Sequence, residues 1–391
     1  MDAAVTTAKR KNLTQTQIIW LAVLGVSYYD FQPLLVGGYV NSFGITEVQA
    51  GLISASNMLG VCLGLAIATI RIHRWDIRHV VLSALLLMGF GELASAFVHS
   101  FEGAVAVRLF TGFGEGLAMA AAASAIVAFA KPDRIFALMM VGMSLYGMVG
   151  LLALPYVIDR FGLPGVFHAI ALLTFVSLPL YRSFPEHEVE DQQGFDGLRA
   201  VLTRLPVVLV LTSLMIVYVS CNGLWTYFER IGADIGIGPS GIGVALSSGL
   251  FASMVGGLLA AILSDKYGRA LPVTSGLVLV TASVVVLYVS SSFAPYTVSV
   301  MLLFGATGFV VPYYMGALAE FDRTGRLPVV GTLIIFVGNF IGPAMAAGLV
   351  NLGTYTTLMF VAAFLFAVSL LLMVIAFQVM RQGAIRVLPE N

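Results

Sequence analysis

The chain contains many long apolar segments, and these segments dominate what it can fold into. Hydrophobic residues make up 59% of the 391 residues and charged residues only 10%, whereas about a quarter of a soluble domain is charged. A helix of about 20 apolar residues crosses the ~30 Å hydrocarbon layer of a membrane. We therefore expect an all-α membrane protein with twelve transmembrane helices. The expected spans are residues 17–40, 46–70, 79–99, 103–130, 134–157, 164–184, 206–228, 240–263, 271–291, 295–319, 327–350 and 355–380.

The second half of the sequence repeats features of the first at a spacing of 191 or 192 positions. The matching pairs are Gly51 with Gly243, Ser56 with Ser248, Gly64 with Gly256, Gly147 with Gly338, and Gly162 with Gly353. Duplication of six spans predicts two pseudo-symmetric six-helix bundles with a binding site between them near the middle of the membrane. The expected domains are residues 1–184 and 206–391, joined by a cytoplasmic linker over 185–205.

Basic residues are distributed unevenly along the chain. If the N-terminus is cytoplasmic, Arg160 and Arg230 lie outside, Arg108 lies within a span, and the remaining Lys and Arg residues face the cytoplasm. An excess of basic residues marks the cytoplasmic side of membrane proteins. We therefore expect a multi-pass protein with both termini in the cytoplasm. The very short outer loops and the lack of a eukaryotic targeting feature favour the bacterial inner (plasma) membrane.

Away from the span ends, four residues of the charged types Asp, Glu, Lys and Arg lie within the expected spans of the first half, namely Asp30, Glu92, Arg108 and Glu115. Each ionised acid near the bilayer centre costs about 2.5–3.5 kcal/mol on insertion scales. One guanidinium cannot fully neutralise three carboxylates, so at least one carboxyl group is expected to take up a proton readily. The set therefore predicts proton coupling. The alternative is a static ion-pair cluster around Arg108 that only holds helices together.

Asp30 has a counterpart in the repeat, because position 222 is an asparagine. An acid in one half and an amide of the same shape in the other suggest two walls of a central cavity. Polar and aromatic residues within spans are the candidates for substrate binding, although each could instead make an interhelical hydrogen bond. These candidates are Tyr29, Gln32, Asn57, Asn222, Trp225, Tyr313 and Asn339.

The loop after the eighth span reads Asp265-Lys266-Tyr267-Gly268-Arg269. Asp265 can cap the N–H groups of a neighbouring helix start and complement its dipole, and the glycine allows a sharp turn. Lys266 and Arg269 can bind carboxylates or lipid phosphates. We expect Asp265, Lys266, Gly268 and Arg269 to form a gating contact between cytoplasmic helix ends.

Twelve spans in duplicated halves, a long central loop and this loop motif resemble the major facilitator superfamily of secondary transporters. The resemblance covers essentially the whole chain. In that family the motif is usually best kept between spans two and three. Here that loop covers residues 71–78, and His73 lies at the position that corresponds to Asp265. The C-terminal copy of the motif is therefore the more complete one.

A second resemblance lies in the fourth span, where Arg108 is followed by Gly112 and Gly116. This arrangement is similar to a pattern in many proton-coupled members of the superfamily. Small residues four positions apart also allow close helix packing in lipid, which is the alternative role of the two glycines.

The resemblance implies secondary active transport of a small organic solute by alternating access, coupled to protons. The alternatives are proton-antiport efflux of drugs or metabolites instead of uptake, and a non-transporting sensor or scaffold on a carrier fold. Three acids against one base argue mildly against a strongly anionic substrate.

Catalytic and nucleotide-binding patterns are missing from the sequence. No His, Cys and Asp cluster has metal-ligand spacing, and no glycine loop ends in Gly-Lys-Ser/Thr. We therefore expect no enzymatic activity, no cofactor, no metal and no nucleic-acid partner. The expected partners are a small-molecule substrate, protons and membrane lipids, and we expect the chain to act as a monomer.

Overall fold

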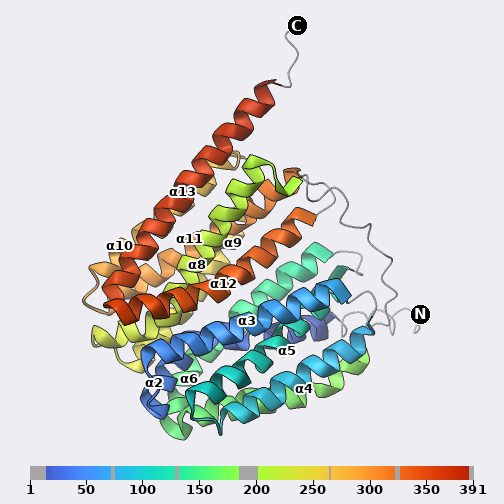
Figure 1. Ribbon diagram of the computed structural model, residues 1–391, viewed down its shortest axis with the longest axis vertical. Coiled ribbons are helices and arrows are strands. Elements are labelled where there is room, and N and C mark those ends of the chain that lie inside the picture. The colour runs from blue at the N-terminus through green and yellow to red at the C-terminus, as the bar shows by residue number, and fades with distance from the viewer. Residues whose placement is uncertain are drawn as a thin grey trace. The chain divides into compact units, whose positions relative to one another are not determined.

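The computed structural model describes residues 15–71, 75–127, 132–184, 201–263, 266–321 and 326–386. These residues form helices joined by short connections, and no strand occurs in the described ranges (Figure 1). The elements are α2 (Ser27–Phe43), α3 (Glu47–Arg71), α4 (Ile77–Ser95), α5 (Phe101–Val127), α6 (Pro132–Val176), the 3₁₀-helix η2 (Leu178–Ser183), α8 (Leu205–Asp234), α9 (Pro239–Leu263), α10 (Ala270–Tyr288), α11 (Phe293–Phe321), α12 (Arg326–Leu352) and α13 (Tyr355–Arg386).

Within these ranges, eleven helical segments are long and apolar enough to cross a membrane. The first is Gln15–Phe43, which contains α2, and the last is Tyr355–Arg381 in α13. The expected all-α fold of membrane-spanning helices is thus confirmed. The count differs by one from the twelve spans expected.

The difference lies in α6, which contains two helical arms that meet at a kink and correspond to the expected spans 134–157 and 164–184. Gly162 has φ of 69° and ψ of 179°, which is not helical, and it divides α6 into two arms. Glycine adopts positive φ without steric cost. Its counterpart Gly353 lies in the short non-helical connection between α12 and α13. The connection expected between two separate helices is therefore a kink in the first half and a true break in the second.

The chain divides into two compact units, Met1–Gln192 and Gln193–Asn391. In the first unit, α5 packs against α3 and α4, while α6 packs against α2 and α4. In the second unit, α11 packs against α9 and α10, while α8 packs against α12 and α13.

The two units repeat the same close helix crossing. A Cβ added to Gly64 of α3 would lie 2.2 Å from the backbone oxygen of Phe113 in α5. At the positions 192 further on, a Cβ added to Gly256 of α9 would lie 2.1 Å from the backbone oxygen of Gly305 in α11. The reverse contacts agree as well, with 2.3 Å between an added Cβ and a backbone oxygen for Gly116 against Val61 and for Gly308 against Ser253. The duplicated small residues therefore produce duplicated packing.

Candidate functional site

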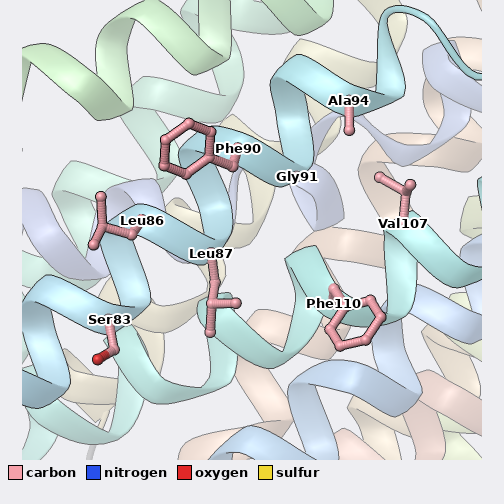
Figure 2. Close-up of a pocket in the computed structure, with 8 residues that line it drawn as sticks. All are labelled: Ser83, Leu86, Leu87, Phe90, Gly91, Ala94, Val107 and Phe110. Carbon is pink, nitrogen blue, oxygen red and sulfur yellow. The ribbon is translucent and has the colours of Figure 1, made fainter.

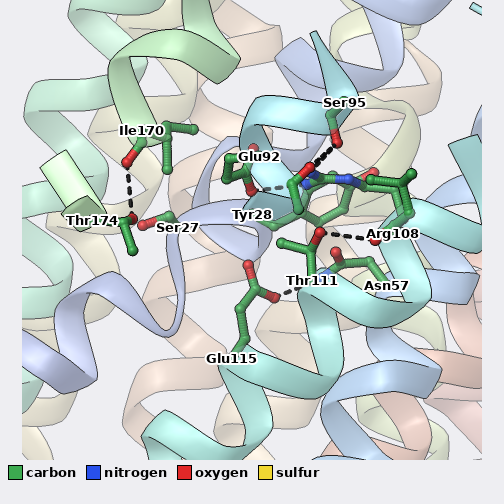
Figure 3. Close-up of polar contacts among 12 residues, drawn as sticks. Ser27, Tyr28, Asn57, Glu92, Ser95, Arg108, Thr111, Glu115, Ile170 and Thr174 are labelled. Atoms are coloured by element: carbon green, nitrogen blue, oxygen red, sulfur yellow. Dashed lines mark hydrogen bonds and ion pairs between the residues drawn. The ribbon is translucent and has the colours of Figure 1, made fainter. Parts of the chain in front are cut away.

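Arg108 and Glu92 form a buried ion pair inside the N-terminal unit (Figure 3). The Arg108 Nη1 atom of α5 lies 2.9 Å from Glu92 Oε1 of α4, and the two side chains are 0% and 2% exposed. Arg108 Nη2 also donates to Ser95 Oγ, which in turn donates to the Gly91 carbonyl at 2.8 Å. The structure thus joins Arg108 to one of the three acids expected near it.

Two aromatic rings face the Arg108 guanidinium. Its Cζ atom lies 5.0 Å from the ring centroid of Tyr28 and 5.3 Å from that of Phe167. Such contacts stabilise a cation, more strongly where water is excluded. Tyr28 is held by a 3.0 Å hydrogen bond between its hydroxyl and that of Ser54. Side chains from α2, α4, α5 and α6 therefore meet at this cation.

Glu115 lies seven residues after Arg108 on α5, and it is buried as well. Asn57 Nδ2 of α3 donates a 2.7 Å hydrogen bond to Glu115 Oε2 (Figure 3). Asn57 was a substrate-binding candidate in the sequence analysis, and the structure places it against one of the acids. This pairing was not anticipated.

Asp30 in α2 is the third buried acid. Its Oδ2 atom has no hydrogen-bond partner among the described residues, and the side chain forms no ion pair with them. If Asp30, Glu92 and Glu115 were all ionised, three negative charges and the one positive charge of Arg108 would leave a net charge of −2. We call the four buried ionisable residues Asp30, Glu92, Arg108 and Glu115 the ionic cluster, in which Glu92 and Arg108 are paired, while Asp30 forms no hydrogen bond or ion pair with the other three in the described part of the chain.

An apolar groove of about 660 Å³ lies between α4 and α5 (Figure 2). Its lining includes Gly91, Ala94 and Val107. The residues that follow them in the sequence are Glu92, Ser95 and Arg108, which are joined by the ion pair and the hydrogen bond of Arg108. Ser83 is the one polar residue of the lining, and Phe90 and Phe110 stand exposed at its sides. The groove therefore offers no charged group to a substrate or a proton.

In the C-terminal unit, Asn222 and Asn339 are brought together. Asn222 Nδ2 of α8 donates to the Asn339 carbonyl of α12 at 2.8 Å, and both side chains are buried. Trp225, one turn further along α8, is buried with its ring edge-on to Phe304 at 4.8 Å. The remaining candidates Tyr29, Gln32 and Tyr313 also lie in membrane-spanning helices, where Gln32 and Tyr313 are buried and Tyr29 is half-buried.

The expected gating loop is described in part, because Asp265 lies outside the described residues. Gly268 has φ of 64°, so the chain turns there as the sequence indicated. Arg269 Nη1 lies 2.7 Å from Glu320 Oε1 and donates to the Gly316 carbonyl at 2.6 Å, which ties the start of α10 to the end of α11. Lys266 is exposed.

The repeat replaces the ionic cluster with uncharged residues in the C-terminal unit. The counterparts 192 positions further on are Val284 for Glu92, Leu287 for Ser95, Val300 for Arg108 and Thr307 for Glu115. All four are buried, and a Cβ added to Gly249, the counterpart of Asn57, would lie 2.6 Å from Val300 Cγ1. An apolar side chain fills this position in the second unit.

Sequence reasoning missed Ser95 and Phe167 as members of the site. Ser95 follows Glu92 by three residues on α4, so helical periodicity already placed both on one face. Phe167 approaches from the second arm of α6, beyond the kink at Gly162. No pattern in the sequence indicated that approach.

The geometry is that of a multi-pass membrane carrier with duplicated halves and a charged interior in the first. The chain belongs to the Major Facilitator Superfamily, whose sequence model matches residues 18–228. It is similar to the 3-(3-hydroxy-phenyl)propionate transporter of Escherichia coli (strain K12), with 27% identity over 350 residues that cover 83% of each chain.

A solved structure shares the fold. It is the crystal structure of a bacterial homologue of the human lysosomal transporter Spinster, in an inward-facing and unoccupied conformation. The TM-score is 0.69 at 13% identity, over 94% of this chain and 95% of that one. The family and these relatives confirm the resemblance drawn from the sequence, and they are transporters, not enzymes.

Proposed function

We propose that this chain is a proton-coupled secondary transporter that takes up a small organic acid by alternating access. We place it in the bacterial inner membrane with both termini in the cytoplasm, as the distribution of basic residues favours. The observation that supports this function most strongly is the ionic cluster, which lies in one half of a duplicated fold.

Packing alone gives no reason to keep the ionic cluster. The α9–α11 crossing in the C-terminal unit repeats the α3–α5 crossing to within 0.1 Å at Gly64 and Gly256, although Val284 and Val300 replace the ion pair. Buried ion pairs often stabilise a fold no better than apolar residues of similar volume, and ionisable residues inside a membrane are expensive. Their presence in the N-terminal half therefore supports a role in transport.

The charges of the cluster balance only when two of its three carboxyl groups are protonated. Glu92 is ion-paired with Arg108, so we assign the protons to Asp30 and Glu115. Asp30 can gain or lose a proton without breaking an ion pair to a described residue. Protonation of Glu115 leaves Asn57 Nδ2 within hydrogen-bond distance. Asp30 is the proposed main proton carrier, with Glu115 as the second.

The proposed substrate is an organic acid with a single carboxylate, by similarity to the relative named for 3-(3-hydroxy-phenyl)propionate. A monocarboxylate that moves together with a proton crosses the membrane as a neutral pair. The acidic cluster disfavours a strongly anionic substrate, and one carboxylate is a modest charge. Asn222, Asn339, Tyr29, Gln32 and Trp225 stay our candidates for contact with it, together with Asn57 and Tyr313.

We propose the gate at the helix ends joined by Arg269. The turn at Gly268 and the contacts of Arg269 with Gly316 and Glu320 support a fixed connection between α10 and α11. Lys266 and Asp265 complete the proposed gating loop.

The test is uptake of 3-(3-hydroxyphenyl)propionate by proteoliposomes with and without an acidic exterior. We expect accumulation above equilibrium only with the pH gradient. Asp30→Asn should equilibrate the acid without accumulating it, whereas Asp159→Asn, the same change at an exposed site, should accumulate it normally. Accumulation by Asp30→Asn, or flux indifferent to the gradient, would overturn the proposal. Movement of the acid against inward proton flow would identify an exporter.

A further inference from the structure

An open groove at one end of the C-terminal unit combines two guanidinium groups with an apolar wall. Its volume is about 590 Å³, and residues of α10, α11 and α13 line it. Arg269 and Arg381 contribute positive charge, and Val374 and Phe377 contribute apolar surface. The proposed proton pathway and substrate contacts do not use this groove, whereas Gly268, Arg269 and Glu320 of the proposed gate line one side of it.

The groove lies where the apolar segments end. Arg269 directly precedes α10, Glu320 is in the last turn of α11, and Arg381 ends the apolar part of α13. Phe377 lies one turn before Arg381 and Val374 about two turns before it, within the apolar segment. In a bilayer the charged end of the groove therefore lies at headgroup level, and its apolar wall faces the acyl chains.

The charge of the lining is positive. Arg269 and Arg381 carry two positive charges and Glu320 one negative charge, which leaves +1. Glu320 contacts Arg269 but is 62% exposed, so water screens this ion pair. Arg381 is exposed and forms no ion pair with another residue in the described part of the chain.

We propose that this groove binds an anionic phospholipid. The phosphate lies between Arg269 and Arg381, and an acyl chain follows Val374 and Phe377. Guanidinium groups donate charge-assisted hydrogen bonds to phosphate oxygens, and anionic lipids attract basic residues at the cytoplasmic surface. A zwitterionic lipid would bring the positive charge of its headgroup toward the two arginines. A free phosphate ion would leave the apolar wall unused.

The test is binding of fluorescent phosphatidylglycerol and phosphatidylcholine to the full chain in detergent. We expect a preference for phosphatidylglycerol that Arg381→Gln lowers about fivefold, the effect of about 1 kcal/mol for one basic residue near an anionic surface. Val374→Trp keeps both arginines but fills the apolar end, and it should weaken binding as well. Arg204→Gln, the same change at an exposed arginine before α8 and outside the groove, should leave binding unchanged.

Three outcomes would overturn the proposal. Equal losses for Arg381→Gln and Arg204→Gln would mean general attraction to basic residues. Unchanged binding by Val374→Trp would mean that no acyl chain lies in the groove. Competition by millimolar inorganic phosphate would mean a site for a free anion. Arg381 is exposed, so an unchanged unfolding temperature would exclude misfolding as the cause of any loss.

Discussion

The two units build the same helix crossing with different chemistry inside. Gly64 against Phe113 and Gly256 against Gly305 approach equally closely, yet a buried ion pair in the first unit is replaced by two valines in the second. The crossing therefore depends on small residues that let backbones meet. The ion pair is an addition to this crossing, and the comparison separates the packing that both units share from the charges that only the first unit has at these positions.

The C-terminal unit has a buried polar cluster of its own, but that cluster is neutral. The Ser213 hydroxyl lies 2.6 Å from the Tyr314 hydroxyl and 2.7 Å from that of Ser369, which links α8, α11 and α13. The positions 192 before Ser213 and Tyr314 are Leu21 and Ala122, which cannot form such bonds. The first unit thus buries an ion pair between α4 and α5, whereas the second buries these hydroxyl groups and, further along α8, the adjacent pair Glu229 and Arg230.

The sharpest way to break this comparison is to give the first unit the interior of the second. Arg108→Val alone leaves Glu92 buried and unpaired, and we expect it to lower the free energy of unfolding by about 3–5 kcal/mol. The triple variant with Arg108→Val, Glu92→Val and Ser95→Leu carries the residues of the second unit, and it should recover most of the lost stability. We expect no proton-driven uptake from either variant. Thermal unfolding in detergent and proteoliposome flux measure the two effects.

The matched control is Arg160→Val, because Arg160 is an exposed arginine of the same unit. It should change neither stability nor uptake appreciably. If the triple variant is as unstable as Arg108→Val, the ion pair is required for folding, and the contrast between the two units loses its functional meaning.

A second test asks whether the crossings are equivalent. An alanine Cβ at Gly64 or at Gly256 would meet a backbone oxygen that cannot move aside. We expect each substitution to lower the free energy of unfolding by about 1–3 kcal/mol. The loss should be similar in the two units. The control is Gly257→Ala on α9, where the nearest atom would be 3.8 Å away. Chemical denaturation should show little change for this variant, and a tolerated Gly256→Ala would contradict the symmetry.

The repeat made much of this fold predictable from sequence, since apolar length gives the spans and the spacing of small residues gives the pairing. The separation of the two arms of α6 at Gly162 agrees with the expected spans, but the sharpness of the connection was not predictable, because a glycine in a kink and one in a longer break look alike in sequence. In the structure, Gly162 joins two helical arms with φ of 69°, whereas α12 ends before Gly353 and α13 begins after it.

The site was predictable in membership and less so in its pairing. The free-energy cost of an unpaired charge in the membrane predicted a partner for Arg108. Helical periodicity, however, fixes only which face of a helix a residue occupies. Which acid it meets depends on how α4 and α5 are aligned with each other. The same reason hid the bond between Asn57 and Glu115, since it depends on the register of α3 against α5.

Tyr314→Phe tests the neutral cluster of the second unit. It removes one hydroxyl and leaves Ser213 and Ser369 bonded to each other, so we expect a loss of about 1 kcal/mol without a change in proton-driven uptake. Thermal unfolding with a flux assay measures both. Tyr156→Phe, at an exposed tyrosine, is the control. Loss of proton coupling in Tyr314→Phe would show that hydroxyl groups of the second unit also carry protons.

The smallest expected effect concerns how the helix ends are fastened. In the first unit, Arg78 Nε donates to the backbone carbonyl of Phe184 at 3.0 Å. In the second, Arg269 has both a backbone acceptor in Gly316 and the exposed Glu320. Since Arg269 keeps its backbone bond, Glu320→Gln should cost at most about 1 kcal/mol, and less at high salt.

Thermal unfolding of Glu320→Gln at low and high salt measures this difference, with Glu102→Gln at an exposed acid of the first unit as control. If Glu320→Gln lowers the free energy of unfolding more than Tyr314→Phe does, the exposed ion pair between Arg269 and Glu320 contributes more to holding α10 against α11 than an exposed pair should. The helix ends of the second unit would then depend on charge, as the interior of the first unit does. The contrast between an ion pair in one unit and valines in the other would then hold only for the buried helix crossing.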